Sequence, residues 1–208
     1  MTAKLVSVLI CLLLLAGCSA ETSDVSEVTA VTEAGVTESP EDLFDRFAAG
    51  EIDAEFLTSS PVVEGRGSVN FNDLDYDPDN IYMSFRVGEQ IDLDNDGENE
   101  LIIDGPYGGM YLDAIDGNLY VFAQALGNGG SLSYTFYDDA MWIVISDTTH
   151  AGRASYVLYK FEGGDNLVDR LSLMAENYYE DQEGVYTFND EPVTEEEYTR
   201  IHDEMFGG

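Results

Sequence analysis

Basic residues are scarce in this 208-residue chain. Eight Lys and Arg residues stand against 42 Asp and Glu residues, which gives a formal net charge of −34 at pH 7. A surface this negative repels phosphate backbones, so nucleic acid is excluded as a partner, whereas cations and basic ligands are attracted. Lysine occurs only at positions 4 and 160, a shortage that fits a high-salt habitat and a GC-rich genome equally well.

Cysteine is equally rare, with only Cys11 and Cys18 in the chain. Cys11 lies in a leader segment that we expect to be removed, so the mature domain would contain no disulfide. Core burial or a bound metal must then provide its stability. The roughly 170 residues that follow a short linker are enough for one such core.

Only one long apolar run is present, at residues 5–15. A helix of about twelve residues covers ~18 Å, which is well short of a ~30 Å hydrocarbon core, so a membrane-spanning helix is not expected. Lys4 precedes the run, the small residues Ala16 and Gly17 follow it, and polar residues come next. This order is typical of an export signal.

The sequence Leu15-Ala16-Gly17-Cys18 resembles the lipobox of bacterial lipoprotein signal peptides. The resemblance implies cleavage before Cys18, a diacylglycerol on its sulfur, and a lipid anchor in the cell membrane on the extracytoplasmic face. In a Gram-negative envelope, Ser19 after the lipidated cysteine would favour the outer membrane. An uncleaved anchor and ordinary secretion are the alternatives.

Three segments are predicted along the chain. Residues 1–17 are the signal peptide, and residues 18–38 are a lipidated cysteine with a disordered acidic tether, because they are rich in Ser, Thr, Glu, Ala and Val and lack aromatics. Residues 39–208 form a single β-rich domain. Some 20 flexible residues have a typical reach of ~25 Å, so the domain can stand clear of the bilayer.

The fold class expected for the domain is mainly β (α+β). A helix should begin at Ser39-Pro40 and end near Gly50, with a short helical continuation around Ala54 as one possibility. Thr194 to Glu197 forms a capping box that predicts a C-terminal amphipathic helix. Between them, turn dipeptides separate short apolar runs, as in an antiparallel meander forming a small sheet, sandwich or partial barrel. The expected strands are 81–91, 100–104, 110–115, 118–124, 131–137, 141–147, 154–161, 166–174 and 184–188.

The most specific site signal is the run of residues 92–100, DLDNDGENE, which leads directly into an apolar strand. Acids at positions one, three and five of a tight loop point inward together, and the glycine at position six permits a sharp turn. Oxygen donors of this kind suit a hard cation, so calcium is favoured over zinc or copper. An acidic surface turn without metal is the alternative.

This loop resembles the calcium loops of FG-GAP and dockerin-like modules. The resemblance implies side-chain oxygens from Asp92, Asp94, Asp96 and Glu100 and a carbonyl oxygen from Glu98. Position twelve, where an EF-hand places its bidentate glutamate, is Ile103, so paired EF-hand helices are not expected. A propeller is not expected either, because the chain has one loop and about nine strands.

The sequence contains two weaker candidate sites. The acidic stretch Asp73, Asp75, Asp77 and Asp79 has Pro78 where a turn glycine should be, which disfavours a metal site. His150 lies in a predicted loop and could act as a general base, but the chain has no G-x-S-x-G or H-E-x-x-H motif, so a surface histidine is expected.

Three function classes remain. The chain as a whole resembles uncharacterised surface lipoproteins of Gram-positive anaerobes, so the favoured class is a non-enzymatic lipoprotein with a structural calcium ion and an unknown extracellular ligand or protein partner. The first alternative is a glycan- or peptide-binding module that uses exposed tyrosines, such as those at positions 107, 111, 178 and 179. The second is a hydrolase with paired acids, a signal of low specificity among 42 acidic residues.

Overall fold

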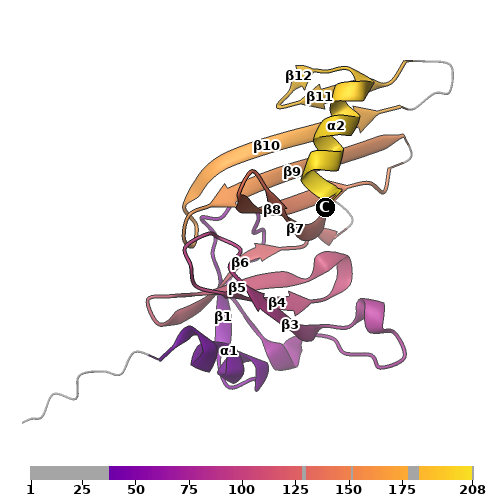
Figure 1. Ribbon diagram of the computed structural model, residues 1–208. Coiled ribbons are helices and arrows are strands. Elements are labelled where there is room, and N and C mark those ends of the chain that lie inside the picture. The colour runs from indigo at the N-terminus through magenta and orange to yellow at the C-terminus, as the bar shows by residue number, and fades with distance from the viewer. Residues whose placement is uncertain (1–37, 128–129, 151, 178–182, 208) are drawn as a thin grey trace, which may run out of the picture. The chain divides into compact units, whose positions relative to one another are not determined.

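The structure, a computed structural model, describes residues 38–127, 130–150, 152–177 and 183–207 (Figure 1). The predicted signal peptide, Cys18, the tether up to residue 37, Tyr178 and Tyr179 lie outside the described residues. The described residues belong to one compact unit. Within the described ranges, no helix is both long and apolar enough to cross a membrane.

Two six-stranded sheets form the centre of the fold (Figure 1). Sheet A has the strand order β2-β1-β6-β5-β4-β3, and sheet B has the order β12-β11-β10-β9-β8-β7. The strands of sheet A are β1 (Asp53–Phe56), β2 (Ser68–Asn70), β3 (Arg86–Ile91), β4 (Glu100–Asp104), β5 (Met110–Ile115) and β6 (Asn118–Gln124). Those of sheet B are β7 (Ser131–Tyr137), β8 (Ala140–Asp147), β9 (Arg153–Phe161), β10 (Leu167–Glu176), β11 (Val185–Phe188) and β12 (Glu191–Pro192).

The predicted mainly β fold with hairpin-connected strands is confirmed. Consecutive strands from β3 to β6 and from β7 to β12 pair antiparallel. Asp116 and Asp138 adopt positive φ angles of 52° and 50° in two of the tight turns, a conformation that aspartate tolerates better than most residues. The two sheets do not close into a barrel.

Two local expectations were wrong. Residues 53–56, near the suggested helical continuation, form β1, because their polar–apolar alternation buries Ala54 on one face. β1 also pairs parallel with β6, the one parallel contact between described strands. The strand expected at 81–91 begins only at Arg86, since Ile81–Met83 is a short 3-10 helix (η2).

Two helices cover the outer faces of the sheets. α1 (Pro40–Ala48) starts where the Ser39 hydroxyl accepts a hydrogen bond from the Asp42 amide at 3.2 Å. α2 (Glu195–Phe206) starts with the predicted capping box, in which Thr194 and Glu197 bond each other's backbone amides. Both helices therefore begin where the sequence signals placed them.

Three apolar clusters show that the elements lie in four layers. Phe44 and Phe47 of α1 pack with Leu101 and Leu112 on one face of sheet A. The opposite face of sheet A packs on sheet B through a cluster that includes Ile102, Phe122, Ile143 and Phe161. On the outer face of sheet B, the buried residues include Trp142, Leu158, Ile201 and Met205, the last two from α2. The order is therefore α1, sheet A, sheet B, α2.

Leu93, in the predicted metal loop, is fully buried in the cluster between the two sheets. The loop connects β3 to β4 and is thus anchored at the junction of the sheets rather than standing out from the surface.

Candidate metal centre

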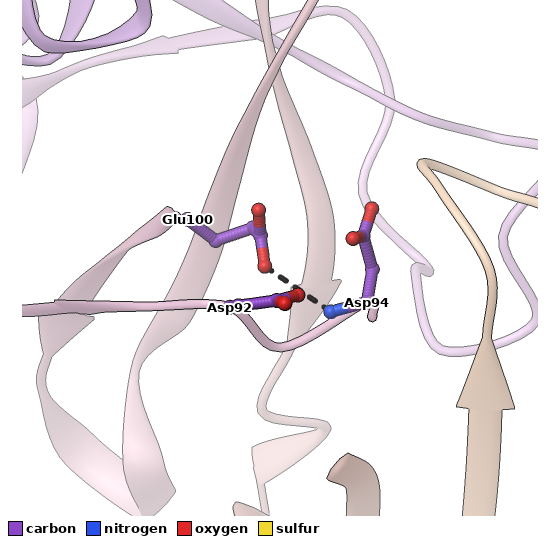
Figure 2. A group of neighbouring side chains, drawn as sticks. All are labelled: Asp92, Asp94 and Glu100. Atoms are coloured by element: carbon purple, nitrogen blue, oxygen red, sulfur yellow. Dashed lines mark hydrogen bonds between the residues drawn. The ribbon is translucent and has the colours of Figure 1, made fainter. Parts of the chain in front are cut away.

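Three acids of the predicted site at residues 92–100 converge on one point. Carboxylate oxygens of Asp92, Asp94 and Glu100 all lie within 4.8 Å of one another. Figure 2 shows Glu100 reaching from the start of β4 across the loop, with its hydrogen bond to the backbone nitrogen of Asp94 dashed. Asp94 and Glu100 each have an exposed fraction of 0%.

Glu100 holds the loop with only one of its two carboxylate oxygens. Oε2 accepts hydrogen bonds from the backbone amides of Leu93 at 2.5 Å and Asp94 at 3.1 Å. Oε1 is buried and has no hydrogen-bond partner among the described residues, and the same is true of Oδ1 of Asp92. A buried carboxylate oxygen without a partner is costly, and a bound cation would remove that cost.

Asp94 is held by the turn between β9 and β10. Its Oδ2 accepts a hydrogen bond from the Gly164 amide at 2.5 Å, and its carbonyl oxygen accepts one from the Gly163 amide at 3.2 Å. Its Oδ1 accepts a third from the Asp96 amide at 3.2 Å. The distant turn therefore closes over the acid and keeps it from solvent.

The backbone turn of the loop depends on its glycine. Gly97 has a φ of 94°, which an L side chain rarely adopts, and its amide donates to Oδ2 of Asp92 at 3.2 Å. Position six of the motif thus has the residue that this turn requires.

The two remaining predicted ligands lie apart from the three clustered acids. Asp96 and Glu98 are exposed, and Oδ1 of Asp96 accepts a hydrogen bond from the Glu98 amide at 2.7 Å. Neither carboxyl group belongs to the group of three acids. The resemblance to calcium loops implied the backbone carbonyl oxygen of Glu98, and not its carboxyl group, as a metal ligand.

Asp113, on β5, is an acid near the loop that the sequence analysis missed. It is 7% exposed, and burial raises its pKa to about 7, with the charges of Asp94, Asp96 and Glu98 adding to the rise. The available signal was an aspartate within the otherwise apolar strand Met110–Ile115.

The pKa values of two of the clustered acids are raised as well. Burial raises the pKa of Glu100 to about 9, and the charge of Asp94 adds to the rise. Burial also raises the pKa of Asp94 to about 6, although the hydrogen bond from Gly164 opposes the shift. Carboxyl groups that resist ionisation in this way are ionised more readily when a cation lies between them. The donor set contains only oxygen and could therefore hold a hard divalent cation.

The other candidates from the sequence lie elsewhere. The acids at 73, 75, 77 and 79 are all exposed, and Oδ1 of Asp77 accepts a hydrogen bond from the Asp79 amide at 2.9 Å. His150 is an exposed residue whose Nδ1 lies 2.9 Å from Oδ2 of Asp147. Among the tyrosines proposed for ligand binding, Tyr107 is 45% exposed but Tyr111 only 3%.

Comparison with known protein-family models, with curated proteins and with solved structures finds no match for this chain.

Proposed function

We propose that this protein is a lipid-anchored extracytoplasmic module whose β domain is stabilised by a calcium ion bound to Asp92, Asp94 and Glu100. The observation that carries the calcium site is the pair of buried, unpartnered oxygens, Oδ1 of Asp92 and Oε1 of Glu100, within a group of three carboxylates. The lipobox resemblance at Cys18 supports the location. The module would bind an extracellular ligand or protein rather than catalyse a reaction.

A structural role for the ion follows from where the loop is attached. Leu93 is buried between the two sheets, and Asp94 is bonded to the β9–β10 turn of sheet B. A cation at this point would join the β3–β4 connection of sheet A to sheet B. Calcium binding and domain stability should therefore be coupled.

The hydrolase alternative is less well supported. A general acid or base must come within hydrogen-bond reach of its substrate. Asp94 and Glu100 have no exposed surface, so a substrate has no direct access to their carboxyl groups.

Thermal melting with calcium or with a chelator tests the proposal. At a hundred times Kd, a ligand specific for the folded state adds about 2.7 kcal/mol of stability. For a domain of this size, that gain corresponds to a rise in Tm of roughly 5–10 °C. Coincident melting curves in calcium and in chelator would contradict a structural calcium ion.

Glu100→Gln provides a sharper version of the test. Its amide oxygen can keep the hydrogen bonds from Leu93 and Asp94, while the unpartnered oxygen is replaced by a neutral NH₂ group. At pH 8 in chelator this variant should be at least as stable as the wild type, because position 100 then holds no carboxyl group whose pKa must rise on folding. It should nevertheless lose the calcium-induced rise in Tm. Asp116→Asn, at an exposed hairpin acid, is the matched control and should keep that rise.

A further inference from the structure

A cleft of about 430 Å³ opens between the two sheets, and its described lining contains none of the three clustered acids. Its walls come from β3, β4 and β5 of sheet A and from β7 of sheet B. β3 and β7 are the last strands of their sheets, so the cleft lies where the two sheet edges meet. This volume falls within the range typical of small-molecule sites.

The floor of the cleft is mostly apolar. Ile102, Tyr111 and Leu132 line it, and none of the three is more than 5% exposed. The ring of Tyr111 packs edge-on against Tyr134, with centroids 6.1 Å apart. The Tyr111 side chain is 3% exposed, and among the described residues its hydroxyl has no hydrogen-bond partner. Because Tyr111 lines the cleft, this hydroxyl is available to a polar group of a ligand there.

The rim of the cleft is anionic. The hydroxyl of Tyr134 donates a hydrogen bond to Oε1 of Glu89 at 2.5 Å, and this bond is the main reason that the pKa of Tyr134 is raised to about 12. On the same side, Nε of Arg86 donates to Oδ2 of Asp104 at 3.0 Å. Oε2 of Glu89 and Oδ1 of Asp104 have no hydrogen-bond partner among the described residues.

A β-bulge explains how Glu89 comes to line the cleft. The pairing of β3 with β4 shifts register between Val87 and Gln90. A Cβ atom at Gly88 would lie 3.0 Å from the carbonyl oxygen of Ile102 and 3.3 Å from Oδ2 of Asp104, so only glycine fits this approach without displacement. Bulges of this kind redirect side chains and are common beside functional sites.

We propose that this cleft binds a small organic cation that carries a primary ammonium group on a hydrocarbon chain. An ammonium group has three N–H donors. Three acceptors of the cleft have no partner among the described residues, namely Oε2 of Glu89, Oδ1 of Asp104 and the hydroxyl oxygen of Tyr111. The hydrocarbon part would lie on the apolar floor, and the aromatic rings of Tyr111 and Tyr134 add attraction for the charge.

A second calcium ion fits the cleft poorly. Calcium takes six to eight oxygen ligands at about 2.4 Å. Only two carboxylates are in the described lining of this cleft, and its floor is apolar. Among the described residues, the acids that lie close enough together to share a metal ion are Asp92, Asp94 and Glu100. The cleft is therefore a separate site from the proposed calcium site.

Isothermal titration calorimetry with butylammonium chloride tests whether the cleft binds an ammonium group. The neutral 1-butanol, which has a similar shape, is the control. We expect saturable binding of butylammonium and none of butanol. Nα-acetyl-lysine amide, measured in parallel, identifies the source of the ammonium group. Tighter binding than butylammonium supports a lysine side chain of a peptide, and weaker binding supports a free amine.

Two variants remove single acceptors without disturbing the fold. Glu89→Gln keeps the bond from Tyr134, and Tyr111→Phe removes a hydroxyl that bonds to none of the described residues. Each should weaken butylammonium binding about tenfold, as expected for the loss of one hydrogen bond to a charged group. Both should melt at the wild-type temperature in chelator.

Glu55→Gln, an exposed acid on β1 of the same sheet, is the matched control and should bind butylammonium as the wild type does. Equal binding by the wild type, Glu89→Gln and Tyr111→Phe would overturn the inference, because the general negative charge of the protein would then be the cause. Equal affinity for butanol, or no binding of butylammonium, would overturn it as well.

Discussion

The side chain of Asn95 completes the backbone hydrogen bonding of Met141, which lies 46 residues further along the chain. Oδ1 of Asn95 accepts from the Met141 amide at 2.8 Å, and Nδ2 donates to the carbonyl oxygens of Met141 at 3.1 Å and Phe161 at 3.0 Å. If the register of β8 and β9 is extended, Met141 falls opposite Phe161. The carboxamide therefore takes the place of one more residue pair between β8 and β9, and it attaches the loop at residues 92–100 to sheet B.

Asn95→Ala should destabilise the domain by about 2–3 kcal/mol, because three partly buried backbone groups lose their partner. The corresponding fall in Tm is roughly 5–10 °C. Asn95 also has a φ of 64°, a conformation that glycine adopts freely, so Asn95→Gly separates the backbone contribution from that of the side chain. Urea denaturation should show that the glycine variant is only slightly more stable than Asn95→Ala. Asn99→Ala, at an exposed position of the same loop, is the control and should leave stability nearly unchanged. If Asn95→Ala and Asn99→Ala were equally stable, the anchoring role of Asn95 would be contradicted.

The stability of the metal-free domain should fall as pH rises from 5 to 9. Burial raises the pKa values of Asp94, Asp113 and Glu100 to about 6, 7 and 9 in the folded protein. Groups raised in this way favour folding while protonated, so their contribution is complete below their unfolded pKa values near 4 and is lost as pH passes through the folded values. Calcium, which needs ionised carboxylates, should stabilise the domain more strongly at pH 8 than at pH 5.

Melting curves in chelator across this pH range check the sign. Ordinary surface acids are fully ionised by about pH 6, so the part of the slope above pH 7 reports mainly Glu100 and Asp113. Glu100→Gln should flatten that part, whereas Asp116→Asn should not. Metal-free stability that increases between pH 7 and pH 9 would contradict the buried acid cluster.

Asp113 lies outside the loop motif and should affect both the stability of the metal-free domain and the affinity for calcium. Asp113→Asn should change these two properties in opposite directions. At pH 8 in chelator the variant should be more stable than the wild type, because one buried charge beside Asp94 is removed. Calcium should bind several-fold more weakly, because the same charge attracts the cation. Calorimetric titration with calcium measures the second effect, with Asp116→Asn as the control. A variant that is less stable in chelator would show that Asp113 has a structural partner instead.

Local features of this fold were predictable because their causes are local. Ser39 and Thr194 begin the helices since each caps amides within three residues, and Asp116-Gly117 forms a hairpin turn because its two residues tolerate positive φ. The convergence of Asp92, Asp94 and Glu100 also follows from spacing within one short loop.

The features that the sequence did not reveal depend on contacts between distant segments. Asp113 approaches the loop only because β5 pairs with β4, and Gly164 reaches Asp94 only because sheet B packs on sheet A. The strand at 53–56 is similar, since its parallel pairing with β6 joins residues that are 65 positions apart, Glu55 and Tyr120. Propensity and spacing carry no information about such pairings.

Cys18→Ala tests the lipid anchor, which the lipobox resemblance predicts. The acyl chains would be attached to the Cys18 sulfur, and each buried CH₂ group contributes about 0.8 kcal/mol to membrane binding, so loss of the sulfur removes the whole anchor. The variant should move from the membrane fraction to the soluble fraction, or remain as an unprocessed precursor. The melting temperature of the released domain should equal that of the wild type, because the substitution lies outside the predicted domain at residues 39–208. Cys11→Ala is the matched control, since that cysteine lies in the apolar run of the signal, and it should leave processing and membrane attachment intact. A Cys18→Ala protein that is processed to the wild-type size and still sediments with membranes would contradict lipidation at this residue.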